Sequence, residues 1–375
     1  MSKKAWIWVI VAIIVIGGAW ALASRGGASS DTGAIKIGFV GPLSGDTASY
    51  GEPIKNGVQL AVDEINKAGG VNGRQIEVIY EDGKCDGQDA ASATQKLVNV
   101  DGVKYIIGGM CSDEAFSMVP IITAAKVVEL TPGASAPKLS GSSPYFLRNN
   151  PNDNEPGTVL ADYLAKSFKK IAIISENTDY AQGIKTVFVN EIQKDGASIV
   201  SAEDYNTGTT DFRSLLTNVK EANPQAIFIN AQSSQNLLLI ARQARQLGIT
   251  SQLASAVFND PATVGAGDAV NGMILADAPG LTTEGKGPEM IKAYEAAYGS
   301  APTYQFYVGA AYDDVHLLAQ AIENVGDDAT KVDQYLHSLS NYDGTIGSYH
   351  FDQNGDFVGV YPILQQIEDG KLVNL

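Results

Sequence analysis

Apolar and polar residues follow two different periods along this 375-residue chain. From residue 35 onward, short β-branched runs alternate with stretches in which apolar residues recur every three or four positions. This alternation is typical of βαβ units, in which helices join parallel strands. The first set predicts strands at 35–40, 75–81, 105–108 and 127–130, and helices at 52–67, 86–100 and 113–125.

A polar stretch with two prolines, residues 148–156, interrupts the alternation and predicts a crossing or hinge. A second set then predicts strands at 170–174, 198–205, 226–229 and 252–254, and helices at 181–194, 211–221 and 234–247. Both sets open with an apolar strand and a loop that ends in a tyrosine, Tyr50 or Tyr180, before a helix. The order of elements therefore predicts two similar α/β lobes, each a doubly wound parallel sheet.

The last third of the chain predicts a strand at 272–275, helices at 288–298, 305–324 and 329–339, and strands at 347–351 and 359–367. A late helical block followed by strands indicates that the chain returns to the first lobe and crosses back. Crossings near residues 150, 277 and 346 would form a three-strand hinge beside a cleft. The predicted N-terminal lobe is 35–150 plus 277–346, and the C-terminal lobe is 151–276 plus 347–375.

The N-terminal segment predicts export from the cytoplasm. Lys3 and Lys4 precede an uncharged, mostly apolar run, and residues 21–23 (ALA) match a signal-peptidase site. Residues 1–23 are therefore either a cleaved signal peptide or, since the run nearly spans a bilayer, an uncleaved membrane anchor. No cysteine follows the run, which argues against a lipoprotein anchor. Residues 24–34 are rich in Gly and Ser and predict a flexible tether.

The composition limits which partners and which kinds of site this chain can have. The formal net charge of −16 disfavours nucleic acid as a partner, and 45% apolar residues suffice for sizeable cores. Three histidines and two cysteines leave little for a zinc site or a His-based triad, so we expect no metal, no cofactor and no enzyme. Outside the cytoplasm Cys85 and Cys111 favour a disulfide, with two buried free thiols as the alternative.

Ligands of parallel sheets bind beyond the carboxyl ends of the strands, which directs attention to the loops there. Ser112 precedes a predicted helix, where its hydroxyl and free backbone N–H groups suit a carboxylate, or simply cap the helix. Gly133 and Ser135 lie in a second such loop, which is either a ligand loop or an ordinary turn. Tyr50 and Tyr180 would face each other across the cleft and cover an apolar part of a ligand.

Taken together, these features resemble the type I periplasmic substrate-binding proteins of the branched-chain amino acid class, which serve ABC importers. The resemblance covers nearly all of 35–375 and is carried by IGFVGPLSG (37–45), YG (50–51), AVDEINKAGGVNG (61–73), Cys85, CS (111–112), TPG (131–133), YAQG (180–183) and AYDDVHLL (311–318). It implies a bilobed clamp that closes on a small ligand and delivers it to a permease and ATPase complex. It also implies a disulfide between Cys85 and Cys111.

The resemblance further implies roles for individual residues. Ser112, Gly133 and Ser135 match positions that hold the ligand's α-carboxylate. Tyr50, Tyr180 and Tyr307 match aromatic positions of the pocket, and Asp153 matches an acidic residue near it.

Two positions depart from the family. Val257 stands where branched-chain binders place a Glu that holds the ligand's ammonium, and Ser233 stands where they have another aromatic residue. Asp153 or Asp260 could supply the missing negative charge, because an unpaired buried ammonium is costly. The expected ligand is therefore a branched-chain type of amino acid, or a related small carboxylate or amide without an ammonium group.

Two other functions stay open at this stage. An anchored sensor domain of a signalling complex would use the same clamp, and neighbouring permease and ATPase genes would argue against it. An exported enzyme would need a nucleophile with a base in reach, which three scattered histidines make improbable. For the importer protein we expect a monomer that meets the membrane only through its N-terminal segment.

Overall fold

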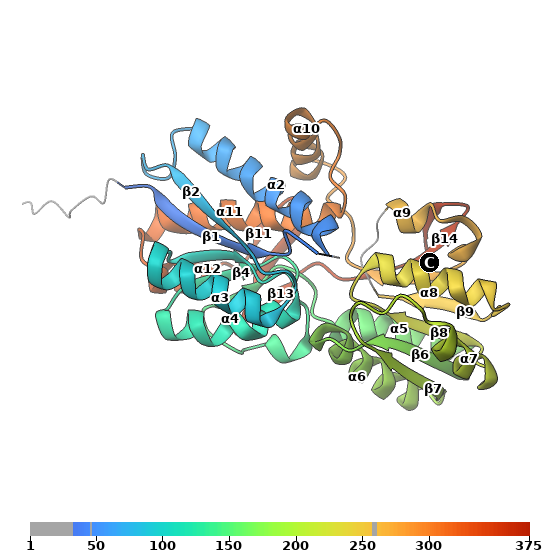
Figure 1. Ribbon diagram of the computed structural model, residues 1–375. Coiled ribbons are helices and arrows are strands. Elements are labelled where there is room, and N and C mark those ends of the chain that lie inside the picture. The colour runs from blue at the N-terminus through green and yellow to red at the C-terminus, as the bar shows by residue number, and fades with distance from the viewer. Residues whose placement is uncertain (1–32, 46, 257–260) are drawn as a thin grey trace, which may run out of the picture. The chain divides into compact units, whose positions relative to one another are not determined.

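The first lobe is built on a five-stranded parallel sheet. In the computed structural model, which describes residues 33–45, 47–256 and 261–375, the strand order is β2-β1-β3-β4-β5 (Figure 1). The strands are β1 (Ile35–Gly41), β2 (Ile76–Asp82), β3 (Tyr105–Gly108), β4 (Val128–Thr131) and β5 (Phe146–Arg148). The predictions for residues 1–32, and those for Val257 and Asp260, lie outside the described residues.

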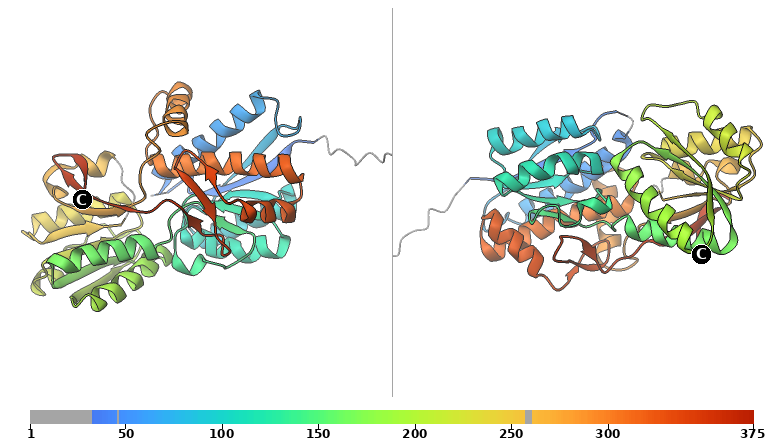
Figure 2. Two further views of the ribbon diagram at one scale, coloured as in Figure 1. Left: turned by 180° about the vertical axis from the view of Figure 1, so that it is seen from behind. Right: turned by 90° about the horizontal axis from the view of Figure 1, so that it is seen from below.

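Helices cover both faces of this first sheet. One core cluster joins β1 to α2 (Ala48–Lys67) and α11 (Gln305–Val325), and the other joins β3 to α3 (Gly87–Lys96) and α4 (Ser112–Ala125). Two further helices, α10 (Lys286–Tyr298) and α12 (Ala329–Ser338), also contribute to the first cluster. Figure 2 shows α11, from late in the chain, lying beside the strands of the first lobe.

The second lobe is built on a seven-stranded sheet of order β15-β14-β10-β9-β8-β6-β7. Its parallel strands are β6 (Lys170–Glu176), β7 (Ser198–Tyr205), β8 (Ala226–Asn230), β9 (Gln252–Ser255) and β10 (Ile274–Asp277). The antiparallel strands β14 (Ile363–Glu368) and β15 (Lys371–Asn374) extend one edge. The predicted class, doubly wound α/β with two similar lobes, is confirmed.

Helices cover both faces of the second sheet as well. α5 (Asn154–Ser167) and α6 (Asp179–Lys194) pack on one face, and α7 (Arg213–Glu221) and α8 (Ser234–Gln246) on the other. The short α9 (Pro261–Val264) follows β9. The sequence predicted no helix at α5, because residues 148–156 were interpreted as a polar crossing. Pro156 lies in the first turn of α5, where proline costs no intrahelical hydrogen bond.

The last crossing lies further along the chain than the sequence indicated. A small antiparallel sheet, β11 (Tyr342–Asp343), β12 (Ser348–Phe351) and β13 (Phe357–Val358), buries Tyr349, Phe351 and Phe357 in the first lobe's core cluster. The chain therefore leaves the first lobe after Val358, and not near residue 346. Asn354 and Gly355 lie in the turn between β12 and β13. Among the residues described, no helix is long and apolar enough to cross a bilayer.

Candidate ligand-binding site

A buried serine begins α4 beyond the carboxyl end of β3. Ser112 is 1% exposed, and its hydroxyl accepts a hydrogen bond of 3.1 Å from the backbone N–H of Ala136. This bond joins the first turn of α4 to the loop that follows β4. Because the first N–H groups of a helix have no intrahelical acceptor, a carboxylate placed here would find donors and the positive end of the helix dipole.

The loop after β4 is held rigidly beside Ser112. The Thr131 hydroxyl donates to the Gly109 carbonyl at 2.9 Å and accepts from the Ala134 N–H at 3.1 Å. At Gly133, a Cβ atom would lie only 2.6 Å from the Met110 carbonyl oxygen, so the close packing of the two loops requires glycine. Two of the three predicted carboxylate residues, Gly133 and Ser135, thus share one fixed loop next to the third.

Ser135 connects this loop to the first crossing between the lobes. Its hydroxyl donates to Asp153 at 3.0 Å. Asp153 is buried, and loss of hydration raises the pKa of its carboxyl to about 7, although Ser135 and the charge of Arg148 oppose that rise. A carboxyl with this pKa is poised to lose its proton when a cation approaches.

The disulfide lies under the same region. Cys85 and Cys111 are bonded, with Cα atoms 5.2 Å apart, which confirms the predicted pairing. The Glu114 carboxylate accepts the backbone N–H of both cysteines, at 3.0 Å each, and burial raises its pKa to about 7. The hydroxyl of the buried Tyr50 is 3.3 Å from the Cys85 sulfur, which fixes the tyrosine at the start of α2.

The second lobe contributes Tyr180, near the start of α6. The Tyr180 hydroxyl donates to the Ala256 carbonyl at 2.8 Å, and burial together with the charges of Asp153 and Asp277 raises the pKa of that hydroxyl. The same two carboxylates also act on Tyr307, at the start of α11, whose hydroxyl donates to Asp277 at 3.3 Å. Residues from both lobes therefore surround one small volume.

That volume is a small, partly open cavity of about 20 Å³. Four of the predicted site residues line it, together with residues of all three crossings: Ser135, Asn150, Pro151, Asp153, Pro156, Tyr180, Ala256, Ala276, Asp277, Ala278, Tyr307 and Pro362. Ser112 and Gly133 are not among these residues. Tyr50 instead meets Tyr304 edge to face, with ring centroids 5.8 Å apart.

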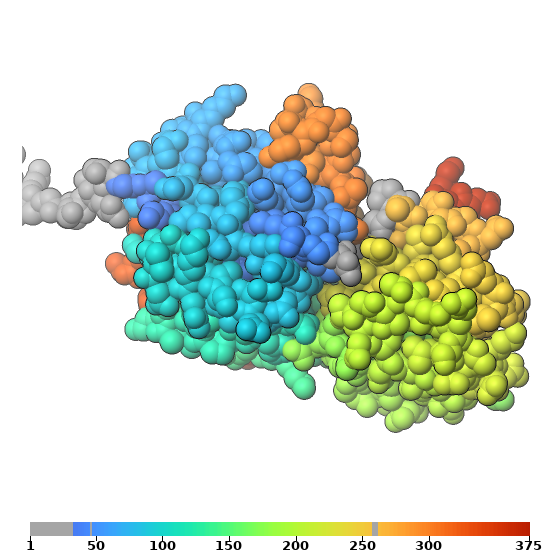
Figure 3. All heavy atoms as spheres, in the orientation of Figure 1, coloured from blue at the N-terminus to red at the C-terminus, as the bar shows by residue number. Residues whose placement is uncertain are grey.

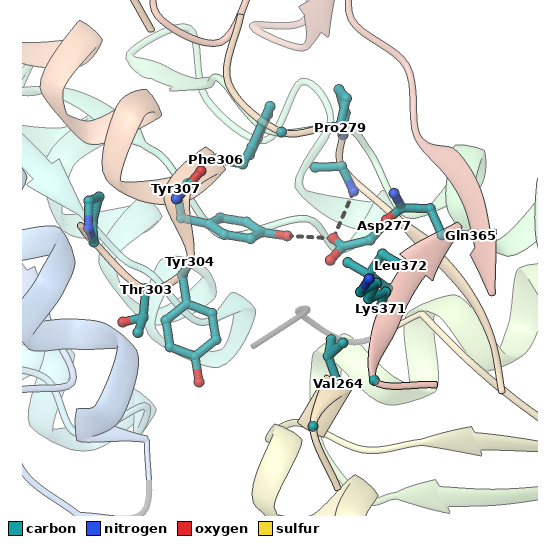
Figure 4. A pocket seen from close by; sticks show the side chains of 16 residues that line it. Val264, Asp277, Pro279, Thr303, Tyr304, Phe306, Tyr307, Gln365, Lys371 and Leu372 are labelled. Atoms are coloured by element: carbon teal, nitrogen blue, oxygen red, sulfur yellow. Dashed lines mark hydrogen bonds between the residues drawn. The ribbon is translucent and has the colours of Figure 1, made fainter. Parts of the chain in front are cut away.

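A larger hollow of about 560 Å³ adjoins the cavity and shares Asp277, Ala278 and Tyr307 with it. Its other walls are mostly apolar, with Pro279, Tyr304, Phe306 and Leu372 among them (Figure 4). The small cavity has room for a single polar group, whereas the hollow has room for an aliphatic side chain.

The two lobes also touch directly. The Asp113 carboxylate of α4 accepts the Asp179 N–H of α6 at 3.3 Å, and the hydroxyl groups of Ser234 and Tyr304 are 3.2 Å apart. Figure 3 shows the surfaces of the first lobe, blue to cyan, and of the second, green to yellow, in contact. Ser233 caps α8, where it accepts the Asn236 N–H at 3.3 Å.

Sequence reasoning missed Asp277 and Tyr304. A signal for Asp277 was present, because it is the one charged residue at the carboxyl end of the apolar strand β10. Tyr304 follows an irregular segment and carried no comparable signal. Within the described part of the chain, no group of three or more His, Cys, Asp or Glu side chains is arranged to hold a metal ion.

Comparisons with known proteins agree with this architecture. A family model described as periplasmic binding protein matches residues 34–371. The Leucine-, isoleucine-, valine-, threonine-, and alanine-binding protein of Pseudomonas aeruginosa is 31% identical over 344 residues, which cover 90% of this chain and 91% of that protein. The Leu/Ile/Val-binding protein of Escherichia coli is 28% identical over 330 residues, covering 87% and 88%.

Solved structures of substrate-binding proteins are also similar to this chain. The branched-chain amino acid transporter substrate binding protein LivJ of Streptococcus pneumoniae, in complex with isoleucine, superposes with a TM-score of 0.82. It is 30% identical and the match covers 90% of this chain and 97% of that one. An ABC transporter substrate-binding protein of Desulfitobacterium hafniense in complex with Leu has a TM-score of 0.75 at 26% identity, with 91% and 100% covered.

Proposed function

Since this chain belongs to the periplasmic binding protein family, we propose that it is the solute-binding protein of an ABC importer for a branched-chain type of amino acid or a related small carboxylate. It binds the ligand between its two lobes and delivers it to the permease. The relatives that cover nearly the whole chain are named for leucine, isoleucine and valine, which supports this ligand class.

The observation that carries the proposal is the meeting of complementary groups from both lobes. The Ser112 hydroxyl and the first turn of α4 offer donors to a carboxylate. The hollow between Tyr304, Phe306 and Leu372 offers apolar walls to an aliphatic side chain. A free amino acid has these two features, a carboxylate and a side chain, on one carbon atom.

The three crossings explain how binding is coupled to shape. A ligand that contacts both lobes stabilises the state in which they touch over the state in which they are apart, by its differential contacts. Contacts such as Asp113 with Asp179 already favour the first state. The permease then has a surface, present only when the lobes meet, by which it distinguishes loaded from empty protein.

We further propose that the protein works outside the cytoplasm, as a monomer and without turning over its ligand. Family membership supports the location, and the pattern of residues 1–23 supports either a cleaved signal peptide or an anchor. Determining the N-terminal residue of the exported chain distinguishes the two: a chain beginning at Ser24 was cleaved, and one beginning at Met1 was not.

A thermal unfolding screen of the purified chain tests the proposed ligand class. At 100 times its Kd a ligand stabilises the native state by about 2.7 kcal/mol, which is easily seen. We expect leucine, isoleucine or valine to raise the unfolding midpoint, and Ser112→Ala to abolish most of the rise. Ser92→Ala, which removes a hydroxyl from the exposed surface of α3, is the matched control and should keep it. If no amino acid or related carboxylate shifts the midpoint, the proposal is wrong.

A further inference from the structure

Helix α6 of the second lobe begins against α4 of the first lobe. The first N–H groups of a helix have no acceptor within that helix, and α6 finds acceptors for them in both lobes. The Thr178 hydroxyl, in the same lobe, accepts the Ala181 N–H at 3.2 Å. The Asp113 carboxylate of α4 accepts the Asp179 N–H at 3.3 Å. A carboxylate of one lobe therefore caps a helix of the other, at the positive end of the helix dipole.

The charge of Asp113 is affected by this contact. Burial raises the pKa of the Asp113 carboxyl, hydrogen bonds from the N–H groups of Asp179 and Tyr180 lower it, and the charge of Asp179 raises it. The donors and the acceptor belong to different lobes, so these bonds exist only while the lobes touch. The cap therefore stabilises the state in which the lobes touch over the state in which they are apart.

A glycine within α6 lets the two lobes approach closely. Gly183 lies in the second turn of the helix, where glycine is destabilising relative to alanine. A Cβ atom at this position would lie 3.1 Å from Cδ of Pro137, in the short helix η2 (Pro137–Leu139) of the first lobe, and 3.8 Å from Cβ of Ala136. A larger residue would hold α6 away from the first lobe. The glycine thus favours the contact at the expense of the helix.

Both contacts adjoin the ligand site without lining it. Asp113 directly follows Ser112, and Asp179 directly precedes Tyr180. The movement that brings Asp113 to the start of α6 therefore also brings Ser112 and Tyr180 toward each other. Neither Asp113 nor Gly183 is among the residues that line the small cavity or the adjoining hollow.

We propose that Asp113 and Gly183 form a latch between the lobes that raises the ligand affinity from outside the ligand site. The latch consists of the bond from the Asp179 N–H to Asp113 and the close packing of Gly183 on Pro137. Part of the free energy of closing then comes from the protein itself, and less has to come from the ligand. Asp113 and Gly183 are positioning residues, and the assignment rests on the proposed function for its ligand.

Calorimetric titration of the full chain with L-leucine tests Asp113. We expect Asp113→Ala to raise the Kd about fivefold or more, because the Asp179 N–H loses its acceptor. Loss of a negative charge beside the ligand carboxylate would by itself lower the Kd, so a rise reports the lost bond. Asp113→Asn keeps an acceptor oxygen and should stay within twofold of wild type. Asp89→Ala, in the exposed first turn of α3, is the matched control and should leave the Kd unchanged.

The same titration and two further measurements test Gly183. Gly183→Leu should raise the Kd at least tenfold, yet leave the unfolding midpoint of the empty chain unchanged or higher, because leucine is the better helix former. With saturating leucine, small-angle X-ray scattering should give this variant a larger radius of gyration than wild type. Thr186→Leu, which places the same side chain on an exposed position of α6, is the matched control and should bind as wild type does.

The possible results separate the two proposals. If wild type binds leucine and either Asp113→Ala or Gly183→Leu binds it within twofold of wild type, the latch is wrong while the proposed function stands. If wild type binds no amino acid or related carboxylate, the proposed function fails, and scattering of the empty chains decides about the latch alone. A larger radius of gyration in both variants than in wild type then supports the latch, and an unchanged radius overturns it.

Discussion

Replacing Arg148 by methionine should destabilise the protein and should also loosen the loop after β4, which carries Gly133 and Ser135. Arg148 is fully buried at the end of β5. Its guanidinium donates to the Ala136 carbonyl at 2.9 Å, to the Ser140 hydroxyl at 2.8 Å and to Asp356 at 2.7 and 2.8 Å. One side chain thus ties the loop after β4 to the β12–β13 turn.

The magnitude follows from what the substitution leaves behind. Methionine fills a similar volume, so little is lost in packing. The Asp356 carboxylate, only 16% exposed, loses its cation, and the Ala136 carbonyl loses a donor. Removing one member of a buried ion pair costs about 3–5 kcal/mol. Because Asp356 retains some contact with solvent and the Ser140 hydroxyl, we expect about 3 kcal/mol.

Urea unfolding of wild type, Arg148→Met and Arg148→Met/Asp356→Leu measures this cost. The double variant removes both charges and should recover at least half of the lost free energy. Leucine binding should also weaken in Arg148→Met. The Ala136 carbonyl loses its donor in this variant, and Ala136 is the residue directly after Ser135, a predicted ligand-binding residue. A loss below about 1 kcal/mol in Arg148→Met, or a double variant no more stable than the single one, would refute the reasoning.

Three further results are expected. Reducing the Cys85–Cys111 disulfide, whose cysteines are 26 residues apart in the sequence, should lower the free energy of unfolding by about 3 kcal/mol. Dithiothreitol should therefore lower the unfolding midpoint, and the variant with both cysteines replaced by serine should show the same midpoint without reductant. Burial raises the pKa of Glu114 to about 7, so between pH 5 and 7 the folded chain holds a proton that the unfolded chain has lost, and this group lowers the free energy of unfolding by about 1.4 kcal/mol per pH unit. Asp153 and Asp313, whose pKa values are also raised to about 7, add to the fall. Glu114→Gln should therefore reduce the wild-type slope by about 1.4 kcal/mol per pH unit, and an unchanged slope would contradict the reasoning. Gly133→Ala would place Cβ 2.6 Å from the Met110 carbonyl oxygen and should weaken leucine binding at least tenfold in a titration; unchanged affinity would mean that the loop adapts.

Much of the fold was predictable because its signals are local. The apolar runs of β1, β3, β6 and β8 are buried throughout or nearly so, and such runs, spaced by amphipathic helices, identify a parallel sheet without knowledge of distant contacts. The loops at Ser112 and Gly133 could be identified from local sequence as well, because each directly follows the carboxyl end of a predicted strand.

The remaining features depend on contacts far apart in the sequence. Residues 148–156 are polar and were interpreted as a crossing, yet Arg148, Asn149 and Asn150 are buried because each finds a partner: Asp356, the Ala310 carbonyl and the Gly133 carbonyl. A sequence does not show that such polar residues have partners elsewhere in the chain, so it predicts that they are exposed to solvent. Asp277 and Tyr304 enter the site in the same way, through crossings whose positions only the assembled lobes define.

The central claim is that one amino acid is held by groups from both lobes at once. Calorimetric titration with leucine of wild type, Ser135→Ala from the first lobe and Tyr180→Ala from the second tests it most directly. One leucine should bind per chain, and the Kd should rise at least tenfold in each variant. Leucine binding that either variant leaves unchanged, or no binding by wild type to leucine, isoleucine or valine, would contradict it.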